Sequence, residues 1–188
     1  MRSKVCSAEY RRRSRLPSPA EVLQGASIGV AERGHVPVLL SLLEDLFTQE
    51  RDFKPNAQKQ VLGLLQIIDH PECGRIFIAR HNNAVIGMAT VLCTISTAEG
   101  GPVLLLEDVI VARPYRGQGI GGLLMRHILC WAQANGFLRV TLLTDPDNTD
   151  ALRFYECNGF VRSGMAVLRQ NLVTACHDDA GHRNKTET

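Results

Sequence analysis

Two kinds of hydrophobic repeat alternate along the chain, and the longer, helix-like repeats predict the helices. Apolar residues recur every three to four positions in three segments: Val36–Phe47, Val61–Ile68 and Gly119–Ala134. That spacing places the apolar residues on one face of a helix. A shorter fourth helix is predicted to begin at a capping residue, Asn148 or Thr149, and to end at Gly159. The pattern therefore predicts four amphipathic helices.

Shorter segments, which alternate between apolar and polar residues or are apolar throughout, predict strands. They are Ser27–Glu32, Arg75–Arg80, Ala84–Ile95, Val103–Val111, Leu138–Leu143 and two last strands at Val161 and Ala166–Leu172. The turn His81-Asn82-Asn83 joins the second and third strands into a hairpin, because Asn tolerates a left-handed backbone. Helices and strands in this order predict one α/β (α+β) domain around a single sheet.

The composition is that of an ordinary globular domain, with 188 residues of which 45% are hydrophobic and 21% charged. No apolar stretch approaches the roughly 18 residues of a membrane span, so no membrane partner is expected. Basic residues are concentrated within residues 1–15, and the rest of the chain is slightly acidic. This balance argues against a nucleic-acid partner. We expect a domain over 23–173, a basic N-terminal extension over 1–22 and a polar tail over 174–188.

The cysteines and the N-terminus bear on redox state and location. Six cysteines are scattered without a Cys-x-x-Cys pair, which predicts reduced thiols and no metal site. Residues 1–22 lack an apolar signal segment, so a cytoplasmic location is expected. The Arg- and Ser-rich N-terminus also resembles an organellar targeting segment, and both that alternative and a plain solvated tail stay open.

A glycine-rich segment opens the most regular of the predicted helices and is the strongest candidate for ligand binding. It reads Arg116-Gly117-Gln118-Gly119-Ile120-Gly121-Gly122. A helix N-terminus offers unpaired N–H donors and a partial positive charge, and glycine lets a ligand approach the backbone closely. Because Arg116 adds a cation at the same place, the segment favours a phosphate-bearing ligand. A turn that needs glycine only for packing is the alternative.

The residues alone leave the identity of that ligand open. The spacing Gly117-x-Gly119-x-x-Gly122 satisfies the dinucleotide fingerprint, which would suit an NAD-binding fragment. The match is weak, because five residues separate the strand from the first glycine and only one strand–helix–strand unit surrounds it. A P-loop is excluded, since no Gly-Lys-Ser/Thr follows.

Two motifs at a matching separation resemble the GNAT superfamily of acyl-CoA-dependent N-acyltransferases. Its pyrophosphate loop, Arg/Gln-x-x-Gly-x-Gly/Ala, is matched by Arg116, Gly119 and Gly121. Its later segment is matched by Asn148, Ala151, Phe154, Tyr155, Gly159 and Phe160. The resemblance runs from about Ser27 to Leu172. It implies a mixed, mostly antiparallel sheet of about 6–7 strands, splayed in the middle and flanked by about four helices.

The resemblance also implies acetyl-CoA as co-substrate, without a metal. In that family the strand before the loop pairs its main chain with the pantetheine arm, and the loop binds the pyrophosphate. Asn148 would orient cofactor or substrate, although it is equally suited to capping its helix. The cofactor-binding residues implied are Val109, Ile110, Val111, Arg116, Gly117, Gln118, Gly119, Ile120, Gly121 and Asn148.

Two residues are expected to carry the chemistry. Tyr155 occupies the position of the family's general acid, and a phenol can protonate a departing thiolate while it stays neutral; a packed core tyrosine is the alternative. Glu107 is favoured as the base, directly or through a water, because it shares an alternation with Val109 and Val111. In the family that the chain resembles, a carboxylate base on this strand commonly lies on that alternation. A chain of waters without a dedicated base is the alternative. Asp108 is expected to bind the acceptor or to form an ion pair.

The acceptor in that family lies against the first two helices and their connection. Here that region offers Glu44 and Phe53 as substrate-binding residues in an acidic stretch, with a solvated charged face as the alternative. The expected function is transfer of an acetyl group to a primary amine of a small molecule, by direct attack in a ternary complex. A non-catalytic acyl-CoA-binding module and an acetyltransferase for protein amines are the alternatives. A homodimer, common in that family, is open.

Overall fold

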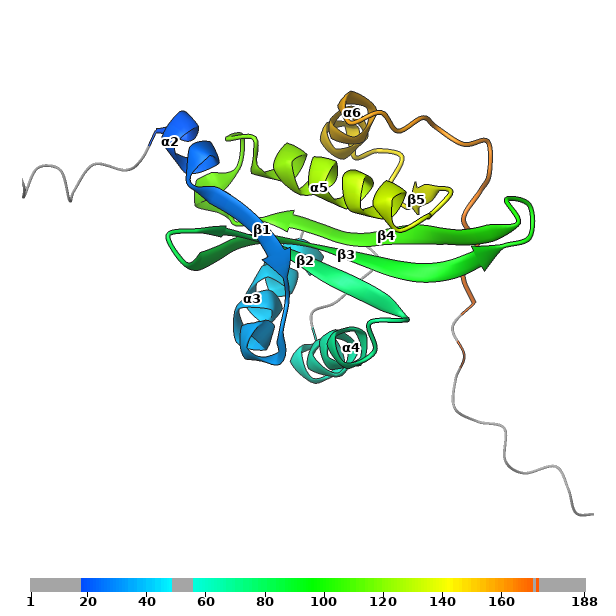
Figure 1. Ribbon diagram of the computed structural model, residues 1–188, viewed down its shortest axis with the longest axis horizontal. Helices are drawn as coiled ribbons and strands as arrows, with labels where there is room; N and C mark the ends of the chain where they lie inside the picture. The colour runs from blue at the N-terminus through cyan, green and yellow to red at the C-terminus, as the bar shows by residue number, and fades with distance from the viewer. Residues whose placement is uncertain (1–17, 49–55, 171, 173–188) are drawn as a thin grey trace, which may run out of the picture.

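A five-stranded sheet lies between two layers of helices in the computed structural model, which describes residues 18–48, 56–170 and 172 (Figure 1). The strands are β1 (Ala26–Val30), β2 (Gly74–His81), β3 (Ala84–Ser96), β4 (Gly101–Val111) and β5 (Val140–Leu142). Their order in the sheet follows the chain from β1 to β5. Every neighbouring pair is antiparallel except β4 and β5, which run parallel. The predicted α/β fold and the hairpin of β2 and β3 are confirmed.

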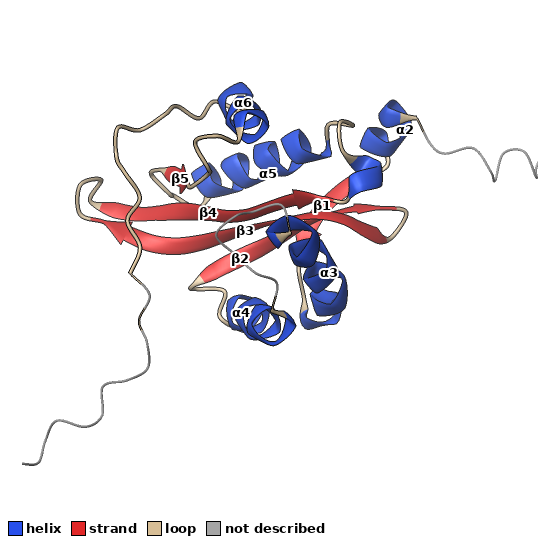
Figure 2. Cartoon of the chain, turned by 180° about the vertical axis from the view of Figure 1, so that it is seen from behind, coloured by secondary structure: helices blue, strands red, loops and turns tan. Residues whose placement is uncertain are grey.

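Helices cover both faces of the sheet (Figure 1 and Figure 2). One face carries α3 (Val36–Phe47) and α4 (Ala57–Asp69), and the other carries α2 (Pro19–Gln24), α5 (Ile120–Ala134) and α6 (Thr149–Cys157). Two turns of 3-10 helix, η1 (Arg33–His35) and η2 (Arg113–Tyr115), precede α3 and the glycine segment. Among the described helices, none has the length and apolarity that crossing a membrane requires.

Each face of the sheet has its own apolar core, and β2 contributes to both. Phe77 and Ala79 face the core beneath α5, whereas Ile76 and Ile78 face the core beneath α3 and α4. All four side chains are at most 1% exposed. A strand buried on both faces is apolar throughout, which explains why its sequence alternates only weakly. The segment that joins β4 to α5 therefore lies where the two layers of helices meet.

The sheet has five strands among the described residues, fewer than the 6–7 expected, because the two last predicted strands do not form. After α6 the described chain up to Gln170 adopts no regular structure. Its apolar side chains are largely exposed: Val161 90%, Met165 88%, Leu168 93% and Leu172 90%. A strand needs a partner edge for its main chain. In the described sheet, β5 is the edge strand that precedes this segment in sequence. Its three residues have too few main-chain N–H and C=O groups to pair with another strand.

Helix α2 lies where the basic extension was expected to end, so the expected boundary between residues 22 and 23 falls inside a helix. Ser18 accepts a hydrogen bond from the Glu21 N–H, and the Glu21 side chain accepts one from the Ser18 N–H at 2.7 Å. This capping box, followed by Pro19 at the first helical position, is a helix signal readable from sequence. Val22 is 1% exposed in the core beneath α5.

Candidate active site

Strand β4 loses its parallel neighbour halfway along its length. Pairing with β5 covers only Leu104–Leu106, whereas β4 continues to Val111. The N–H of Ala112 donates to the carbonyl of Ile86 on β3 at 2.8 Å. By alternation, the main-chain groups of Val109 and Val111 point the other way, to the edge that β5 leaves open. This is the expected splay, and it leaves a strand edge to which an extended ligand can be added.

Ile110 lies between these two residues and directs its main chain to β3. A Cβ atom on Gly87 would stand 2.9 Å from the Ile110 carbonyl oxygen, which places that oxygen at the β3 side. The Ile110 side chain is buried beneath α3 and α4. Of the three residues expected to pair with pantetheine, Val109 directs both main-chain groups and Val111 its N–H to the open edge, and Ile110 directs neither. The carbonyl of Val111 accepts a hydrogen bond from Nε of Arg116 at 2.7 Å.

A β-bulge interrupts β4 at its two acidic residues. One residue of β3, Thr90, stands opposite two residues of β4, Glu107 and Asp108. The extra residue reverses the alternation, so Leu106 and Val109 both face the core beneath α5 although an odd number of positions separates them. The face assigned to Glu107 by simple alternation therefore does not hold, because that assignment required an uninterrupted strand.

The two carboxylates of the bulge differ in environment. Glu107 is exposed, whereas Asp108 is partly buried. Burial, together with the neighbouring charge of Glu107, raises the pKa of Asp108 to about 6, while the Thr90 hydroxyl partly opposes that shift. A carboxylate with such a pKa is ionised at pH 7 and is a stronger base than an ordinary aspartate. Burial therefore makes Asp108 a candidate general base beside Glu107, the residue to which the sequence analysis gave that role.

The glycine segment forms a turn that delivers the chain into α5. Gln118 Nε2 donates to the carbonyl of Pro114 at 2.8 Å and closes the turn. Gly119 is the N-cap of α5, with a φ of 84°, and no side chain caps the helix. The first N–H groups of α5 therefore have no side-chain acceptor at the cap, which is the arrangement that binds phosphate. The predicted loop and helix are both confirmed as structural elements.

We expect Gly119→Ala to lower the free energy of unfolding by about 1–2 kcal/mol, because the left-handed conformation at Gly119 strains any residue with a Cβ atom. Thermal unfolding of the purified variant measures this loss. Gly122→Ala is the matched control, since its Cβ would meet only side-chain ends, Nη1 of Arg126 at 3.4 Å and Oδ1 of Asn158 at 4.0 Å. An equal loss in both variants would contradict the role assigned to the turn.

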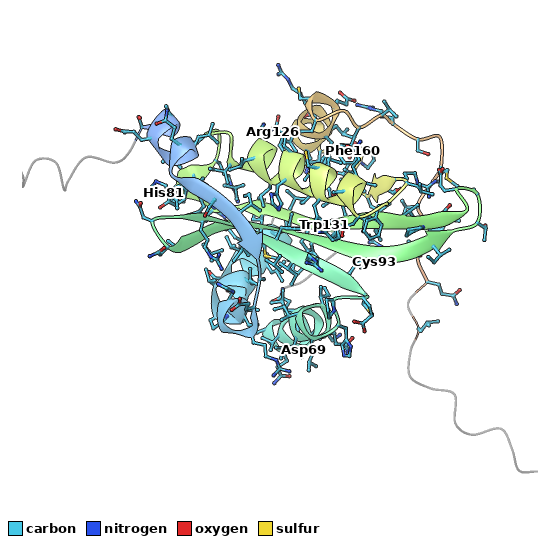
Figure 3. The ribbon with its side chains drawn as sticks, in the orientation of Figure 1. Asp69, His81, Cys93, Arg126, Trp131 and Phe160 are labelled. Atoms are coloured by element: carbon cyan, nitrogen blue, oxygen red, sulfur yellow. The ribbon has the colours of Figure 1, made fainter. Side chains whose placement is uncertain are left out.

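Helix α6 packs on the first turn of α5 and carries the predicted acid. A Cβ on Gly121 would lie 3.1 Å from the Phe154 ring, so glycine at this position allows the two helices to approach closely. Asn148 accepts a hydrogen bond from the N–H of Ala151 at 3.1 Å, which establishes its capping role. The Tyr155 ring lies 5.8 Å from that of Phe160, which Figure 3 labels on this side of the sheet. Tyr155 is therefore partly buried against the core beneath α5, next in sequence to Phe154, which contacts the glycine segment.

An ion-pair cluster joins α3 to η2 and to the residue that follows it, before the glycine segment. Arg113 reaches the two carboxylate oxygens of Asp45, with Nη2 2.7 Å from Oδ1 and Nε 3.1 Å from Oδ2. Nη2 of Arg116 lies 3.1 Å from Oδ2 of the same residue. Asp45 raises the pKa of Arg113 through this hydrogen bonding. Local spacing could not reveal the cluster, because 68 and 71 positions separate the partners in sequence.

Beside this cluster lies a hollow of about 570 Å³ between α3 and the start of the turn. Polar side chains from α3 line one wall and the segment after β4 lines the other: Ser41, Glu44, Asp45 and Thr48 against Ala112, Arg113 and Pro114. Glu44, expected to bind the acceptor, is therefore part of a concave surface. Phe53, the other expected acceptor residue, lies outside the described residues. Within the described chain, no three His, Cys, Asp or Glu residues gather as metal ligands would.

The chain is similar in sequence to known proteins. The family model described as "Acetyltransferase (GNAT) family" matches residues 38–160. The chain is 33% identical over 115 residues to N-alpha-acetyltransferase 40 of Saccharomyces cerevisiae, which covers 52% of this chain and 40% of that protein. It is 35% identical over 72 residues to streptothricin acetyltransferase A of Bacillus subtilis, which covers 38% and 42%. The matched regions span less than half the length of either relative.

A solved structure agrees with the fold. The aminoglycoside N-acetyltransferase AAC(6')-Iy in complex with CoA superposes with a TM-score of 0.66 at 18% identity, over 78% of this chain and 94% of that chain. The family match over residues 38–160 takes in the open edge of β4, the glycine segment and α6. On this match, the chain belongs to the acetyltransferase (GNAT) family.

Proposed function

We propose that the protein transfers an acetyl group from acetyl-CoA to a primary amine of a small molecule, within a ternary complex. The observation that carries the proposal is the continuity of two surfaces. The open main-chain edge at Val109 and Val111 leads directly to the glycine-rich N-terminus of α5. One extended ligand can add to the strand edge and place its phosphates at the helix N-terminus. The CoA bound to a protein of the same fold supports this assignment.

The proposed chemistry divides the proton transfers between two residues. Acetyl-CoA supplies an activated thioester, whose acyl carbon forms a bond with the amine nitrogen while the carbon–sulfur bond breaks. Asp108 accepts the proton that the amine loses, because burial makes its carboxylate more basic than usual. The hydroxyl of Tyr155 donates its proton to the departing thiolate sulfur. The amine reacts in its neutral form, so it loses one proton to Asp108 while the thiolate gains one from Tyr155. Transfer of a proton from Asp108 to the Tyr155 phenolate through solvent then restores both residues.

We place the acceptor at the hollow beside α3. Its wall carries Glu44 and Asp45, and Asp45 is already paired with two arginines. Glu44, exposed on the same wall, is the carboxylate that we assign to a cationic amine. An open hollow of this size suits a small amine better than a flat surface would. Relatives named for streptothricin and aminoglycosides support a small acceptor, whereas the yeast relative is named for N-alpha acetylation.

Thermal unfolding in the presence of CoA, acetyl-CoA and NAD tests the cofactor. At about 100 times the dissociation constant, a ligand adds roughly 2.7 kcal/mol to the free energy of unfolding. For a domain of this size that raises the melting temperature by on the order of 5–10 °C. We expect the rise with both CoA species and none with NAD. A rise with NAD alone would contradict the proposal.

Release of free CoA thiol with a panel of acceptors then tests the reaction. The panel pairs small primary amines, including amino sugars and polyamines, with peptides that have a free N-terminus. We expect turnover with a member of the first group. Turnover confined to the peptides would move the acceptor class to protein amines, and tight CoA binding without turnover would indicate a binding module.

A further inference from the structure

Asp45 stands between the two halves of the proposed site. It belongs to α3, which forms one wall of the acceptor hollow, and its carboxylate binds Arg113, the first residue of η2, and Arg116, which follows η2. The same Arg116 donates from Nε to the carbonyl of Val111, at the open end of β4. A continuous chain of contacts therefore runs from α3 through Arg116 to the strand edge and the start of the glycine turn.

This chain of contacts fixes the shape of the turn. The turn from Ala112 to Gly119 has few residues in regular structure, so its main chain depends on such side-chain anchors. Arg113 and Arg116 lie three residues apart in the first part of this turn, and one partly buried carboxylate, 27% exposed, holds both of them. A guanidinium that binds a carboxylate through two nitrogens has a defined orientation, as Arg113 does here. Displacement of Asp45 would therefore release both arginines and the part of the turn that leads into the glycines.

We propose that Asp45 is a positioning residue for cofactor binding, which holds the glycine turn in the conformation that presents the α5 N-terminus to the CoA diphosphate. The inference rests on the proposed function. Because Asp45 lies on α3, it also links the acceptor wall mechanically to the cofactor loop. The carboxylate itself makes no favourable contact with an anionic ligand, so its contribution is through Arg113 and Arg116.

The direction of the effect distinguishes positioning from charge. Removal of a carboxylate near an anionic ligand, considered as charge alone, would strengthen the binding of that ligand. Loss of positioning has the opposite sign, because the turn must then be ordered when the ligand binds. We expect Asp45→Asn to raise the Kd for CoA by roughly tenfold and to raise the KM for acetyl-CoA similarly. The kcat at saturating acetyl-CoA is expected to stay within about twofold.

Asp69→Asn is the matched control. Asp69 of α4 binds Arg33 through both oxygens, at 2.7 and 2.6 Å, with a side-chain exposure of 29%, so it loses the same kind of ion pair far from the turn. Calorimetric titration with CoA measures Kd for both variants and the unaltered protein. We expect the Kd to rise for Asp45→Asn alone. An unchanged or lowered Kd in Asp45→Asn would overturn the inference.

Two further measurements keep the test decisive. A second variant is measured if Asp45→Asn lowers the melting temperature more than Asp69→Asn does. Arg116→Gln breaks the same ion pair by changing its other partner. The double variant is then expected to raise Kd no more than the larger single effect, because both changes break one chain of contacts. Fully additive effects would overturn the inference. Absence of CoA binding by the unaltered protein would instead contradict the proposed function.

Discussion

Asp108→Asn is expected to lower kcat by about two to four orders of magnitude, the contribution of a positioned general base. The amide keeps the shape of the side chain at the β-bulge and cannot accept the amine proton. Steady-state release of CoA thiol at saturating substrates measures the effect. Glu107→Gln provides the contrast, because Glu107 is exposed. A larger loss in Glu107→Gln than in Asp108→Asn would return the base role to Glu107.

The dependence of rate on pH gives a second test of the same assignment. The base acts when it is ionised, so kcat is expected to rise with pH and to level off above about 6, the pKa to which burial raises Asp108. This inflection is expected to disappear in Asp108→Asn. In Glu107→Gln it is expected to move to lower pH, because the charge of Glu107 contributes to the raised pKa of Asp108.

Stability is expected to change in the direction opposite to activity. The pKa of Asp108 in the folded protein is about 6, above the value of about 4 for an unfolded aspartate. The folded state therefore binds this proton more tightly, and the resulting stabilisation is complete below pH 4 and is lost as pH rises through 6. At pH 7 Asp108→Asn is expected to raise the free energy of unfolding by on the order of 1–3 kcal/mol, with little change at pH 4. Denaturant unfolding at both pH values measures this difference.

Tyr155→Phe is expected to lower kcat by about two orders of magnitude, the lower part of the range for a general acid. The phenylalanine ring retains the edge contacts with Phe154 and Phe160, at 5.2 and 5.8 Å, so the melting temperature should change little. The KM values should also change little if the hydroxyl acts only on the departing thiolate. Turnover and thermal unfolding of the same preparation separate these effects.

Tyr115→Phe is the matched control for the acid. It makes the same chemical change in η2, where the ring lies 6.2 Å from that of His81. We expect its turnover to remain within a few-fold of the unaltered protein. Unchanged turnover in Tyr155→Phe across pH would show that the thiolate leaves without help from this residue.

The elements that the sequence predicted well are those whose signal is local. Helix α5 was found with nearly its observed bounds because Ile120, Leu124 and Ile128 recur at helical spacing and all face the core. The glycine turn was found because positive φ at Gly119 requires that residue type. Helix α2 was not predicted although its capping box lies in the sequence, because its first residues fall in the segment that was interpreted as a basic extension.

The features that could not be predicted depend on pairing between distant segments. The bulge at Glu107 and Asp108 exists only relative to Thr90 on β3, so nothing in the β4 sequence by itself reverses the alternation. The expected face of Glu107 followed from that missing information. The strands expected after α6 differ for a related reason, because Val161 and Leu168 have the pattern of strands but find no edge to pair with. A hydrophobic pattern indicates which residues can be buried. Whether a neighbouring strand is available for pairing depends on the topology of the sheet.

The ion pairs of Asp45 have a consequence for the order in which the protein folds. They join positions 68 and 71 residues apart, whereas the β2–β3 hairpin and α5 are built from near neighbours. Contacts that close long loops form only after the intervening chain has lost much of its entropy. The cofactor turn therefore reaches its final geometry late, after the sheet and α3 have come together. Competence to bind the cofactor thus reports on completion of the whole domain rather than on the local formation of α5.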